Sequence, residues 1–341
     1  MARAYKVAFI GCGRRARSHV PGVQADQRCN VVALADTNRE AAEQFNTDYE
    51  FNAAVYTDYQ ELLAKESPEI VITCLWTPLH LPVFKACAEA GVKAVLSEKP
   101  VAPTWGECLE TVRIAESSGC QLTFSHQRRF AEGNLLARKL IADGVFGKIE
   151  RMDLYSPKNI LDCGPHTFDQ AMSFNNESPA RWVLGAVDAT ELVDWFGVPS
   201  ESLAVGLLVF ENGVRANIQV GGDDFDMRNG VRVIGDKGFF EINWAGKFLR
   251  GRVYDDPSWQ LPQTDKGGQA MMKALVAEAI DCLESGAESQ VSYIKAVRAA
   301  EITFAFYESV RRHGRVELPL ENVTDNPFLS MLEAGHLGPK Q

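Results

Sequence analysis

The sequence lacks the patterns that mark several classes of protein. None of its eight cysteines forms a C-x-x-C pair, so it indicates neither a zinc ribbon nor a thioredoxin-like site. No apolar run approaches the roughly 18 residues that cross a bilayer. A signal-peptide pattern is also missing, because an apolar strand begins within the first few residues. We therefore expect a cytoplasmic protein with reduced cysteines and no membrane partner.

An excess of basic side chains is missing as well. The formal net charge is −10, and the acidic residues are spread along the chain rather than gathered in one block. Nucleic acids and anionic membranes bind clustered lysine and arginine, so the charge argues against both as partners. The net charge does not argue against a small anionic ligand, because one local basic pocket can bind it.

The length and the apolar content predict two globular domains. The chain has 341 residues, of which 46% are hydrophobic and 23% are charged, as is ordinary for a globular protein. This length exceeds what a single core usually holds. We expect a first domain over residues 1–125, a second over 126–320 and a C-terminal tail over 321–341.

The first domain alternates short apolar runs with helical patterns. Such runs are typical of strands buried on both faces, and repeated strand–helix units predict a doubly wound parallel sheet of the α/β class. Capping boxes begin at Thr57 and Thr104. The predicted strands cover 7–10, 31–35, 69–75, 92–96 and 122–124, and the predicted helices end at 23 or cover 38–45, 82–90 and 104–119.

The second domain has a different pattern. Glu211–Gly213 and Asp236–Gly238 are turn sequences between apolar runs, which is typical of antiparallel hairpins. We expect an α+β domain with an open, mostly antiparallel sheet. The predicted strands cover 149–155, 182–189, 203–210, 214–220, 231–234 and 239–242, and the predicted helices cover 135–141, 167–174, 270–283 and 293–312.

A glycine-rich motif follows the first predicted strand. Gly11, Gly13 and Ala16 form G-x-G-x-x-A between a strand and a helix, the context that a dinucleotide-binding fingerprint requires. The first glycine permits a tight turn, the second lets the backbone approach a pyrophosphate, and Ala16 lets helix and strand pack closely. The N-terminus of the helix then offers free N–H groups to the phosphates.

Asp36 bears on which dinucleotide is bound. It ends the second predicted strand, roughly 20 residues after the motif, where a Rossmann domain places the acid that binds the ribose. A carboxylate accepts hydrogen bonds from a 2′-OH and repels a 2′-phosphate, so NAD is favoured over NADP. Arg14, Arg15 and Arg39 count against this choice, because each can pair with a 2′-phosphate. In the simpler interpretation they are solvated side chains, and Asp36 merely ends a strand.

Glu98-Lys99-Pro100 follows the strand predicted over 92–96. Ligands of open α/β sheets bind at the carboxyl ends of the strands, so this charged pair is well placed for chemistry. A lysine that is partly desolvated beside a cationic nicotinamide ring can have its pKa lowered enough to transfer a proton. The alternative is a surface Glu–Lys ion pair.

A second polar group of residues is the run Asp162–Asp169, DCGPHTFD. If Pro165 is the first residue of a helix, Asp162 lies just before it and His166 lies in its first turn. A histidine flanked by carboxylates is suited to acid–base work near neutral pH. Alternatively, Asp162 only caps the helix, or the run binds a metal; we predict no metal, because a further convergent His or Cys is missing.

These motifs together resemble those of the glucose–fructose oxidoreductase and inositol dehydrogenase (Gfo/Idh/MocA) family. The resemblance extends from the N-terminus to about residue 315. It implies a Rossmann domain followed by an α+β domain whose open sheet forms a subunit interface, and hence a homodimer or homotetramer. It is carried by VAFIGCGRRA, Ala35-Asp36, Glu98-Lys99-Pro100, Arg129-Phe130, Gly147-Lys148-Ile149 and the D-x-x-x-H-x-x-D run at Asp162.

The resemblance also implies residue roles. Lys99, Asp162 and His166 match the family's catalytic set: His166 takes the proton of the substrate hydroxyl as hydride leaves, Lys99 hydrogen-bonds the reacting oxygen, and Asp162 binds a neighbouring hydroxyl or orients the pair. His80 matches a histidine that follows the strand at 69–75. The cofactor residues that we expect are Gly11, Gly13, Arg14, Arg15, Asp36, Leu75, Trp76, His80, Glu98 and Lys99.

One stretch departs from the family pattern. A T-P-N run usually precedes the histidine that matches His80, whereas this chain has Leu75-Trp76-Thr77. A tryptophan there changes the wall beside the cofactor. The substrate residues that we expect are His126, Arg128, Tyr155, Asp162 and His166, with Gln127, Asn159 and Trp244 as further candidates. Arg128 or Arg129 either binds a substrate carboxylate or packs under the second domain.

We expect an oxidoreductase that transfers a hydride between NAD(H) and a secondary alcohol or ketone of a sugar, a sugar acid or a cyclic polyol. A redox-neutral, NAD-dependent glycosidase or lyase is a second interpretation, since it uses the same groups and returns the hydride. A non-enzymatic, NAD(H)-sensing binding protein is a third; loss of Lys99 or His166 would mark it, and neither residue is lost.

Overall fold

The computed structural model describes residues 4–195, 197–222, 230–264 and 268–338. The chain forms two compact units. Unit 1 contains the residues up to Ala102, Glu107–Gln127 and Gly268–Ala296, and unit 2 contains Pro103–Gly106, Arg128–Gly267 and the residues from Val297 on. The chain therefore returns to unit 1 late in the sequence. The expected domains 1–125, 126–320 and 321–341 are continuous segments, and their limits stay a prediction.

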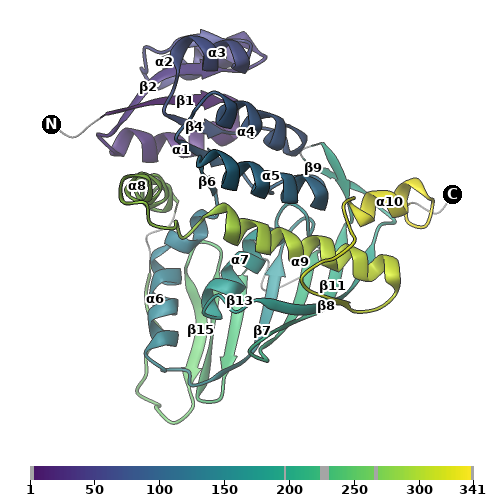
Figure 1. Ribbon diagram of the computed structural model, residues 1–341. Helices are drawn as coiled ribbons and strands as arrows, with labels where there is room; N and C mark the ends of the chain where they lie inside the picture. Colours follow the sequence, from purple (N-terminus) through teal and green to yellow (C-terminus); the bar gives the residue numbers. More distant parts are fainter. Residues whose placement is uncertain (1–3, 196, 223–229, 265–267, 339–341) are drawn as a thin grey trace. The chain divides into compact units, whose positions relative to one another are not determined.

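Unit 1 contains a six-stranded parallel sheet with the strand order β3-β2-β1-β4-β5-β6 (Figure 1). This is the doubly wound sheet that the sequence predicts, and the strand order reverses between β1 and β4. The elements are β1 Tyr5–Ile10, α1 Arg14–Ala25, β2 Cys29–Ala35, α2 Arg39–Asp48, β3 Ala54–Tyr56, α3 Tyr59–Glu66, β4 Ile70–Thr73, η1 Thr77–Leu79, α4 His80–Glu89, β5 Ala94–Ser97, α5 Trp105–Ser118 and β6 Gln121–Phe124. The short helix η2 Gln127–Phe130 begins at the last residue of the segment Glu107–Gln127 and otherwise belongs to unit 2.

Side-chain caps fix the starts of two helices in this unit. Asn38 accepts a hydrogen bond from the N–H of Ala41 at the start of α2. Asp58 accepts one from the N–H of Gln60, at 2.8 Å, at the start of α3. The capping box expected to begin at Thr57 is therefore wrong by one residue, because the carboxylate of Asp58 satisfies the first turn instead.

Helix α8 (Gln269–Ser285) belongs to unit 1 and packs on α1. The two helices approach closely at Gly22. A Cβ built there would lie 2.5 Å from the carbonyl oxygen of Met272 and 2.6 Å from the side chain of Val276. The crossing of α1 and α8 therefore depends on the missing side chain at residue 22.

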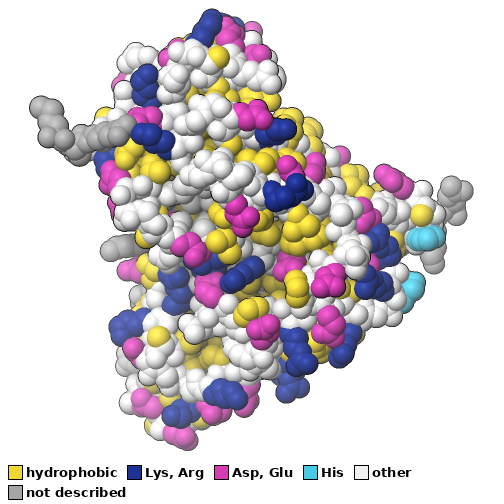
Figure 2. Space-filling view, in the orientation of Figure 1, with side chains coloured by type: hydrophobic (Ala, Val, Ile, Leu, Met, Phe, Trp, Pro, Cys, Tyr) yellow, Lys and Arg dark blue, Asp and Glu magenta, His cyan; other side chains and the backbone are white. Residues whose placement is uncertain are grey.

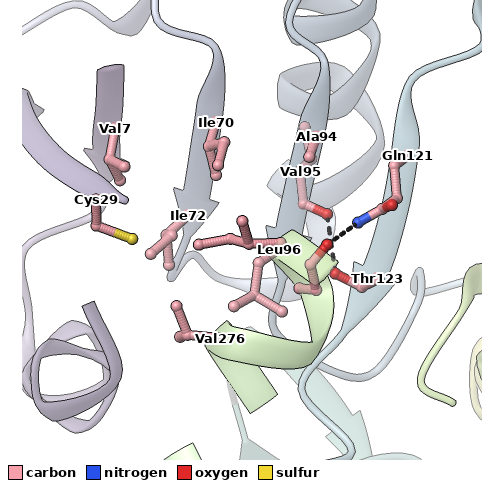
Figure 3. Close-up of a pocket in the computed structure, with 12 residues that line it drawn as sticks. Val7, Cys29, Ile70, Ile72, Ala94, Val95, Leu96, Gln121, Thr123 and Val276 are labelled. Atoms are coloured by element: carbon pink, nitrogen blue, oxygen red, sulfur yellow. Dashed lines mark hydrogen bonds between the residues drawn. The ribbon is translucent and has the colours of Figure 1, made fainter. Parts of the chain in front are cut away.

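The same helix also lies against the sheet. Figure 3 shows Val276 of α8 close to Ile72 and Leu96, beside a cavity of about 20 Å³. The two polar side chains in its lining are satisfied: Gln121 donates to the carbonyl oxygen of Ala279 at 2.7 Å, and Thr123 donates to that of Val95. An apolar space this small is typical of close packing in a protein core.

Unit 2 contains an eight-stranded sheet with the order β15-β14-β13-β7-β12-β11-β8-β16. Only β7 and β12 pair in parallel among these strands, so the predicted open, mostly antiparallel sheet is confirmed. The elements are α6 Glu132–Ala142, β7 Ile149–Ser156, α7 Gly164–Phe174, β8 Ala180–Asp188, β9 Val193–Trp195, β10 Val198–Ser200, β11 Leu203–Phe210, β12 Arg215–Gly221, β13 Gly230–Gly235, β14 Gly238–Asn243, β15 Phe248–Val253, α9 Tyr293–Arg312, β16 Val316–Glu317 and α10 Pro327–Glu333.

The two predicted hairpin turns are present in the structure, whereas several of the shortest elements were not predicted. Glu211–Gly213 joins β11 to β12, and Asp236–Gly238 joins β13 to β14; both pairs are antiparallel. Strands β9, β10 and β16 have two or three residues, too few for a periodic pattern. Helix α10 was also missed, although Asn326 caps it and Pro327 begins it.

The two faces of the unit 2 sheet differ in polarity. Met152, Val233 and Phe240 lie opposite one another on adjacent strands and are fully buried. Helix α7 covers this face, where Phe174 meets Phe240 with ring centroids 5.8 Å apart. On the other face, Arg232 forms ion pairs with Asp153 and Glu241.

The surface mixes both signs of charge. Figure 2 shows acidic and basic side chains interspersed over the visible face rather than segregated. In the part of the chain that the structure describes, no helix has the length and apolar character needed to cross a membrane.

Candidate functional site

The glycine loop between β1 and α1 uses its two glycines differently. Gly11 has φ +88°, and a Cβ there would lie 2.3 Å from the carbonyl oxygen of Cys74. Gly13 has nothing within 4 Å of an added Cβ. It is also the N-cap of α1, where no side chain caps the first turn. The loop therefore packs tightly on Cys74 at Gly11 and leaves open space at Gly13, beside a helix start that no side chain caps.

Asp36 stands at the end of β2, next to this loop. One carboxylate oxygen accepts from the N–H of Cys12 at 2.8 Å, and the other accepts from the N–H of Asn38 at 2.9 Å. Each oxygen retains capacity to accept a further hydrogen bond. Asp36 thus fixes the glycine loop and still presents an anionic acceptor, as a ribose diol requires.

A cleft of about 570 Å³ runs along the carboxyl ends of these strands. Five of the expected cofactor residues line it: Gly11, Gly13, Asp36, Leu75 and Trp76. The other residues that line it were not predicted; they are Ile10, Ala35, Thr37, Thr57, Tyr59, Cys74, Leu79 and Val83. Thr57 directly follows β3, and Thr37 is the second residue after β2, so the rule that ligands bind where parallel strands end would have found them.

The departure from the family pattern forms one wall of this cleft. The side chain of Trp76 is 64% exposed and that of Leu79 is 48% exposed. Large apolar side chains this exposed indicate a surface for a ligand when they line a cleft. In this chain a tryptophan and a leucine thus provide apolar area beside Gly13 and Asp36.

The three arginines near the motif lie in different surroundings. Arg14 is exposed at the start of α1. The Nε of Arg15 lies 2.7 Å from a carboxylate oxygen of Glu98. Arg39 pairs with Glu43 one turn along α2, at 2.8 Å on the exposed surface. Arg15 and Arg39 therefore have carboxylate partners.

Glu98 is buried at the centre of a charged cluster. Besides Arg15, it meets His19 of α1, whose Nε2 lies 2.7 Å from the same carboxylate oxygen. Burial opposes ionisation of Glu98, but Arg15 and His19 outweigh it and lower the pKa to about 2. The carboxylate thus ties α1 to the segment that carries Lys99, which is half-buried.

His80 joins the segments that follow β4 and β5 rather than lining the cleft. Its Nδ1 lies 2.7 Å from the carbonyl oxygen of Pro100, and its Nε2 lies 3.2 Å from that of Leu75. Burial lowers the pKa of His80, although both carbonyls favour the protonated ring. The ring therefore positions the loop after β4 and the Glu98-Lys99-Pro100 segment.

In unit 2, Asp162 lies in the loop before α7, and His166 lies in the first turn of α7. Both side chains are buried. Cys163 rather than Asp162 is the N-cap, and Pro165 is the second helical residue, so the alternative that Asp162 merely caps the helix is wrong. Its backbone N–H donates to the side-chain oxygen of Asn159 at 2.7 Å.

Trp244 lies between His166 and a guanidinium group. The rings of His166 and Trp244 are 6.0 Å apart, and the guanidinium carbon of Arg128 lies 3.0 Å from the centre of the indole ring. The structure thus brings together three of the residues named from the sequence. A cation held over an aromatic face is a favourable contact.

Other candidates lie elsewhere. Tyr155 lines a polar cleft of about 310 Å³ with Asn217 and Gln219, on the sheet face opposite α7. Arg129 is buried against Asp169, with Nη2 2.8 Å from a carboxylate oxygen, so these two residues form a structural ion pair. His126 is buried in unit 1, two residues after the end of β6. Among the described residues, no group of three or more His, Cys, Asp and Glu side chains could hold a metal ion.

The glycine loop, the uncapped start of α1 and Asp36 at one cleft define a dinucleotide-binding Rossmann domain. Residues 5–126 match the model of an oxidoreductase family with an NAD-binding Rossmann fold. This segment therefore belongs to the Gfo/Idh/MocA family, and the resemblance predicted from the motifs is confirmed. Residues 5–126 accordingly form an NAD-binding Rossmann domain.

Individual relatives match over part of their length. An inositol 2-dehydrogenase/D-chiro-inositol 3-dehydrogenase of Halalkalibacterium halodurans is 32% identical over 145 residues, which cover 42% of this chain and 41% of the relative. A 2,7-anhydro-N-acetylneuraminate hydratase of Mediterraneibacter gnavus is 35% identical over 145 residues, which cover 42% of this chain and 37% of the relative. The chain spans about half the length of the curated relatives it matches.

Solved structures share the fold of nearly the whole chain. The WlbA dehydrogenase of Bordetella pertussis, solved with NADH and UDP-GlcNAcA, has a TM-score of 0.80 and 20% sequence identity. The similarity covers 94% of this chain and 99% of that one. At this identity it shows the fold and nothing finer.

Proposed function

We propose that this protein is an oxidoreductase that transfers a hydride between NAD(H) and a secondary alcohol or ketone of a sugar, a sugar acid or a cyclic polyol. The observation that carries the proposal is the cleft of unit 1. There, Gly13 leaves open space beside the uncapped start of α1, and Asp36 accepts hydrogen bonds on the same cleft.

The residues of this cleft fit a dinucleotide. The N–H groups of the first turn of α1 would hold the pyrophosphate, and the carboxylate of Asp36 would accept from a ribose hydroxyl. Asp36 would repel a 2′-phosphate, and Arg39 already has Glu43 as a partner. We therefore propose a preference for NAD(H) over NADP(H).

The acid–base residues are proposed on the family resemblance. When bound, NAD⁺ supplies the hydride acceptor. His166 takes the proton of the substrate hydroxyl, Lys99 hydrogen-bonds the reacting oxygen, and Asp162 binds a neighbouring hydroxyl or orients the pair. The buried first turn of α7, with Trp244 beside His166, gives the base a fixed orientation, which efficient proton transfer needs.

A panel assay tests the proposal. Purified protein is incubated with NAD⁺, and separately with NADP⁺, against inositols, aldoses, uronic acids and glycosides, and the absorbance of reduced nicotinamide is followed. We expect NAD⁺ reduction with at least one polyol or sugar and a lower rate with NADP⁺. Failure of every compound to reduce either nucleotide would contradict the proposal.

A redox-neutral lyase or glycosidase is the second candidate. It is favoured by the similarity to the 2,7-anhydro-N-acetylneuraminate hydratase, whose name describes a reaction without net oxidation. Such an enzyme would consume a glycoside or anhydro-sugar with a catalytic amount of NAD⁺ and release no NADH. Product analysis of the same panel separates the two functions, because only the oxidoreductase forms one NADH per substrate consumed.

A further inference from the structure

The loop between β7 and α7 is held by an unusual set of contacts. Within the loop, the backbone oxygen of Asn159 accepts from the N–H of Cys163 at 3.1 Å, and its side-chain oxygen accepts from the N–H of Asp162. Ile160, which follows Asn159 in this loop, is completely buried. The loop therefore leads into Asp162 and His166 through a short, internally bonded turn.

Glu201 holds this loop from outside. This residue follows β10 in the chain and is completely buried. One carboxylate oxygen accepts from the N–H of Ile160 at 2.6 Å, and the other accepts from the hydroxyl of Tyr307, on α9, at 2.7 Å. The carbonyl oxygen of Ile160 has a separate partner, since the hydroxyl of Thr303, also on α9, lies 3.4 Å from it. Both backbone groups of Ile160 are thus engaged by distant parts of unit 2.

A carboxyl group is a costly choice for this position. The partners that the structure gives it, peptide N–H groups and a phenol, are all neutral, and burying a carboxylate without a cation costs free energy. Burial accordingly raises the pKa of Glu201 to about 7, against the effect of its hydrogen bonds. An apolar side chain would fill the space at lower cost, but it could not bind two donors that come from different elements.

We propose that Glu201, supported by Tyr307, is a positioning residue that fixes the Asn159–Asp162 loop and, through it, the side chains of Asp162 and His166. The catalytic consequence of this arrangement rests on the proposed function, whereas the clamping of the loop does not. Because a displacement of about 1 Å in a catalytic group can reduce a rate by about a hundredfold, loss of the clamp would slow turnover without touching the cofactor cleft of unit 1.

Hydrogen exchange tests the clamp itself. The wild-type protein, Glu201→Ala and Glu201→Gln are compared by mass spectrometry over the peptide that contains residues 157–163. Glutamine keeps an oxygen that accepts from Ile160, so it is the matched control. We expect at least about tenfold faster exchange of this peptide in Glu201→Ala and near-normal exchange in Glu201→Gln. Equal exchange in all three proteins would overturn the proposal. If Glu201→Ala does not fold, Tyr307→Phe takes its place, because it removes only the hydroxyl.

Kinetics test the consequence. With the polyol that gives the fastest NAD⁺ reduction, we expect kcat to fall by about ten- to a hundredfold in Glu201→Ala, with an unchanged Kd for NADH and recovery in Glu201→Gln. An unchanged kcat, or a loss in Glu201→Gln as large as in Glu201→Ala, would overturn the positioning role. If no polyol is oxidised, the proposed function fails, and the exchange experiment still decides whether Glu201 clamps the loop.

Discussion

Gly11 and Gly13 show how two neighbouring glycines can serve different needs. Gly11 combines a positive φ with a backbone contact to Cys74, so any side chain would disturb the fold. Gly13 has an ordinary φ and free space around it. Packing therefore does not explain the glycine at residue 13, whereas the approach of a phosphate does.

We predict that Gly13→Ala separates binding from stability. The added methyl group meets no protein atom, so the free energy of unfolding should change by less than about 1 kcal/mol. It would occupy the space into which the pyrophosphate comes, so the Kd for NADH should rise at least about tenfold, a cost of about 1.4 kcal/mol. Fluorescence titration and thermal unfolding measure the two effects.

Gly11→Ala is the matched control for this prediction. Its methyl group would clash with the backbone of Cys74 and require a strained φ, so it should destabilise the protein by roughly 2–4 kcal/mol. An unchanged Kd for NADH in Gly13→Ala would show that the space at Gly13 is not the phosphate site.

Glu98 and Glu201 should make the free energy of unfolding depend on pH in two different ranges. The pKa of Glu98 is lowered from 4.5 to about 2, so its stabilising contribution is complete above about pH 4.5 and is lost as the pH falls toward 2. The pKa of Glu201 is raised from 4.5 to about 7, so folding favours its neutral form. That contribution is complete below about pH 4.5 and is lost as the pH rises through 7.

We therefore predict that the wild type loses stability relative to Glu201→Gln between pH 5 and pH 8, by roughly 1–3 kcal/mol. Urea unfolding at the two pH values measures the difference. Asp48→Asn is the control: Arg17 lowers the pKa of Asp48, so the stability difference of this variant from the wild type should stay constant over this range. A constant difference for Glu201→Gln as well would show that Glu201 titrates normally in the folded protein.

The sequence revealed some of these residues because their signal is local. Gly11, Gly13 and Asp36 belong to a motif with fixed spacing, which points to the cofactor cleft. Glu201 and His19 lie in no such motif, and their partners Ile160 and Glu98 are 41 and 79 residues away along the chain. Only the tertiary structure brings such groups together.

At the scale of elements, α8 packs closely on α1 because Gly22 of α1 has no side chain at the crossing. We predict that Gly22→Ala destabilises the protein by roughly 1–3 kcal/mol, because its methyl group would meet the backbone of Met272. Gly314→Ala is the control, since the nearest atom to its Cβ is 3.9 Å away. Denaturant unfolding of both variants measures this, and equal stability would contradict the close crossing of the two helices.

Elements with strong local signals were predictable, and those defined by tertiary packing were not. The two turns at Glu211–Gly213 and Asp236–Gly238 specify their hairpins through glycine and polar residues. The helix over 270–283 was also predicted, but its packing on the first unit was not, because helical periodicity says which face is apolar and not what covers it. Strands β9 and β10 depend on each other for their hydrogen bonds.

At the scale of the whole molecule, the sheet of unit 2 offers a surface for self-association. On the face opposite α7, the side chains of Leu184 and Val205 are 43% and 41% exposed. The family resemblance implies that this open sheet joins subunits. Exposed apolar side chains on one face agree with that expectation, which we state as a proposal.

We predict that the wild type is a dimer or tetramer and that the double variant Leu184→Asp, Val205→Asp is a monomer. Burying two carboxylates from each copy in the interface would cost more free energy than the interface provides. Leu109→Asp, whose side chain is 40% exposed on α5 of unit 1, is the control and should keep the native mass. Light scattering gives the masses, and a monomeric wild type would contradict the prediction.

The central claim is that this chain uses His166 to exchange a hydride between a polyol or sugar and NAD. The direct measurement is the yield of NADH per substrate consumed, in the wild type and in His166→Ala. We predict one NADH per substrate in the wild type and a rate lower by about 10²–10⁴-fold in His166→Ala, with an unchanged Kd for NADH. Substrate consumption without NADH, or an undiminished rate in His166→Ala, would contradict it.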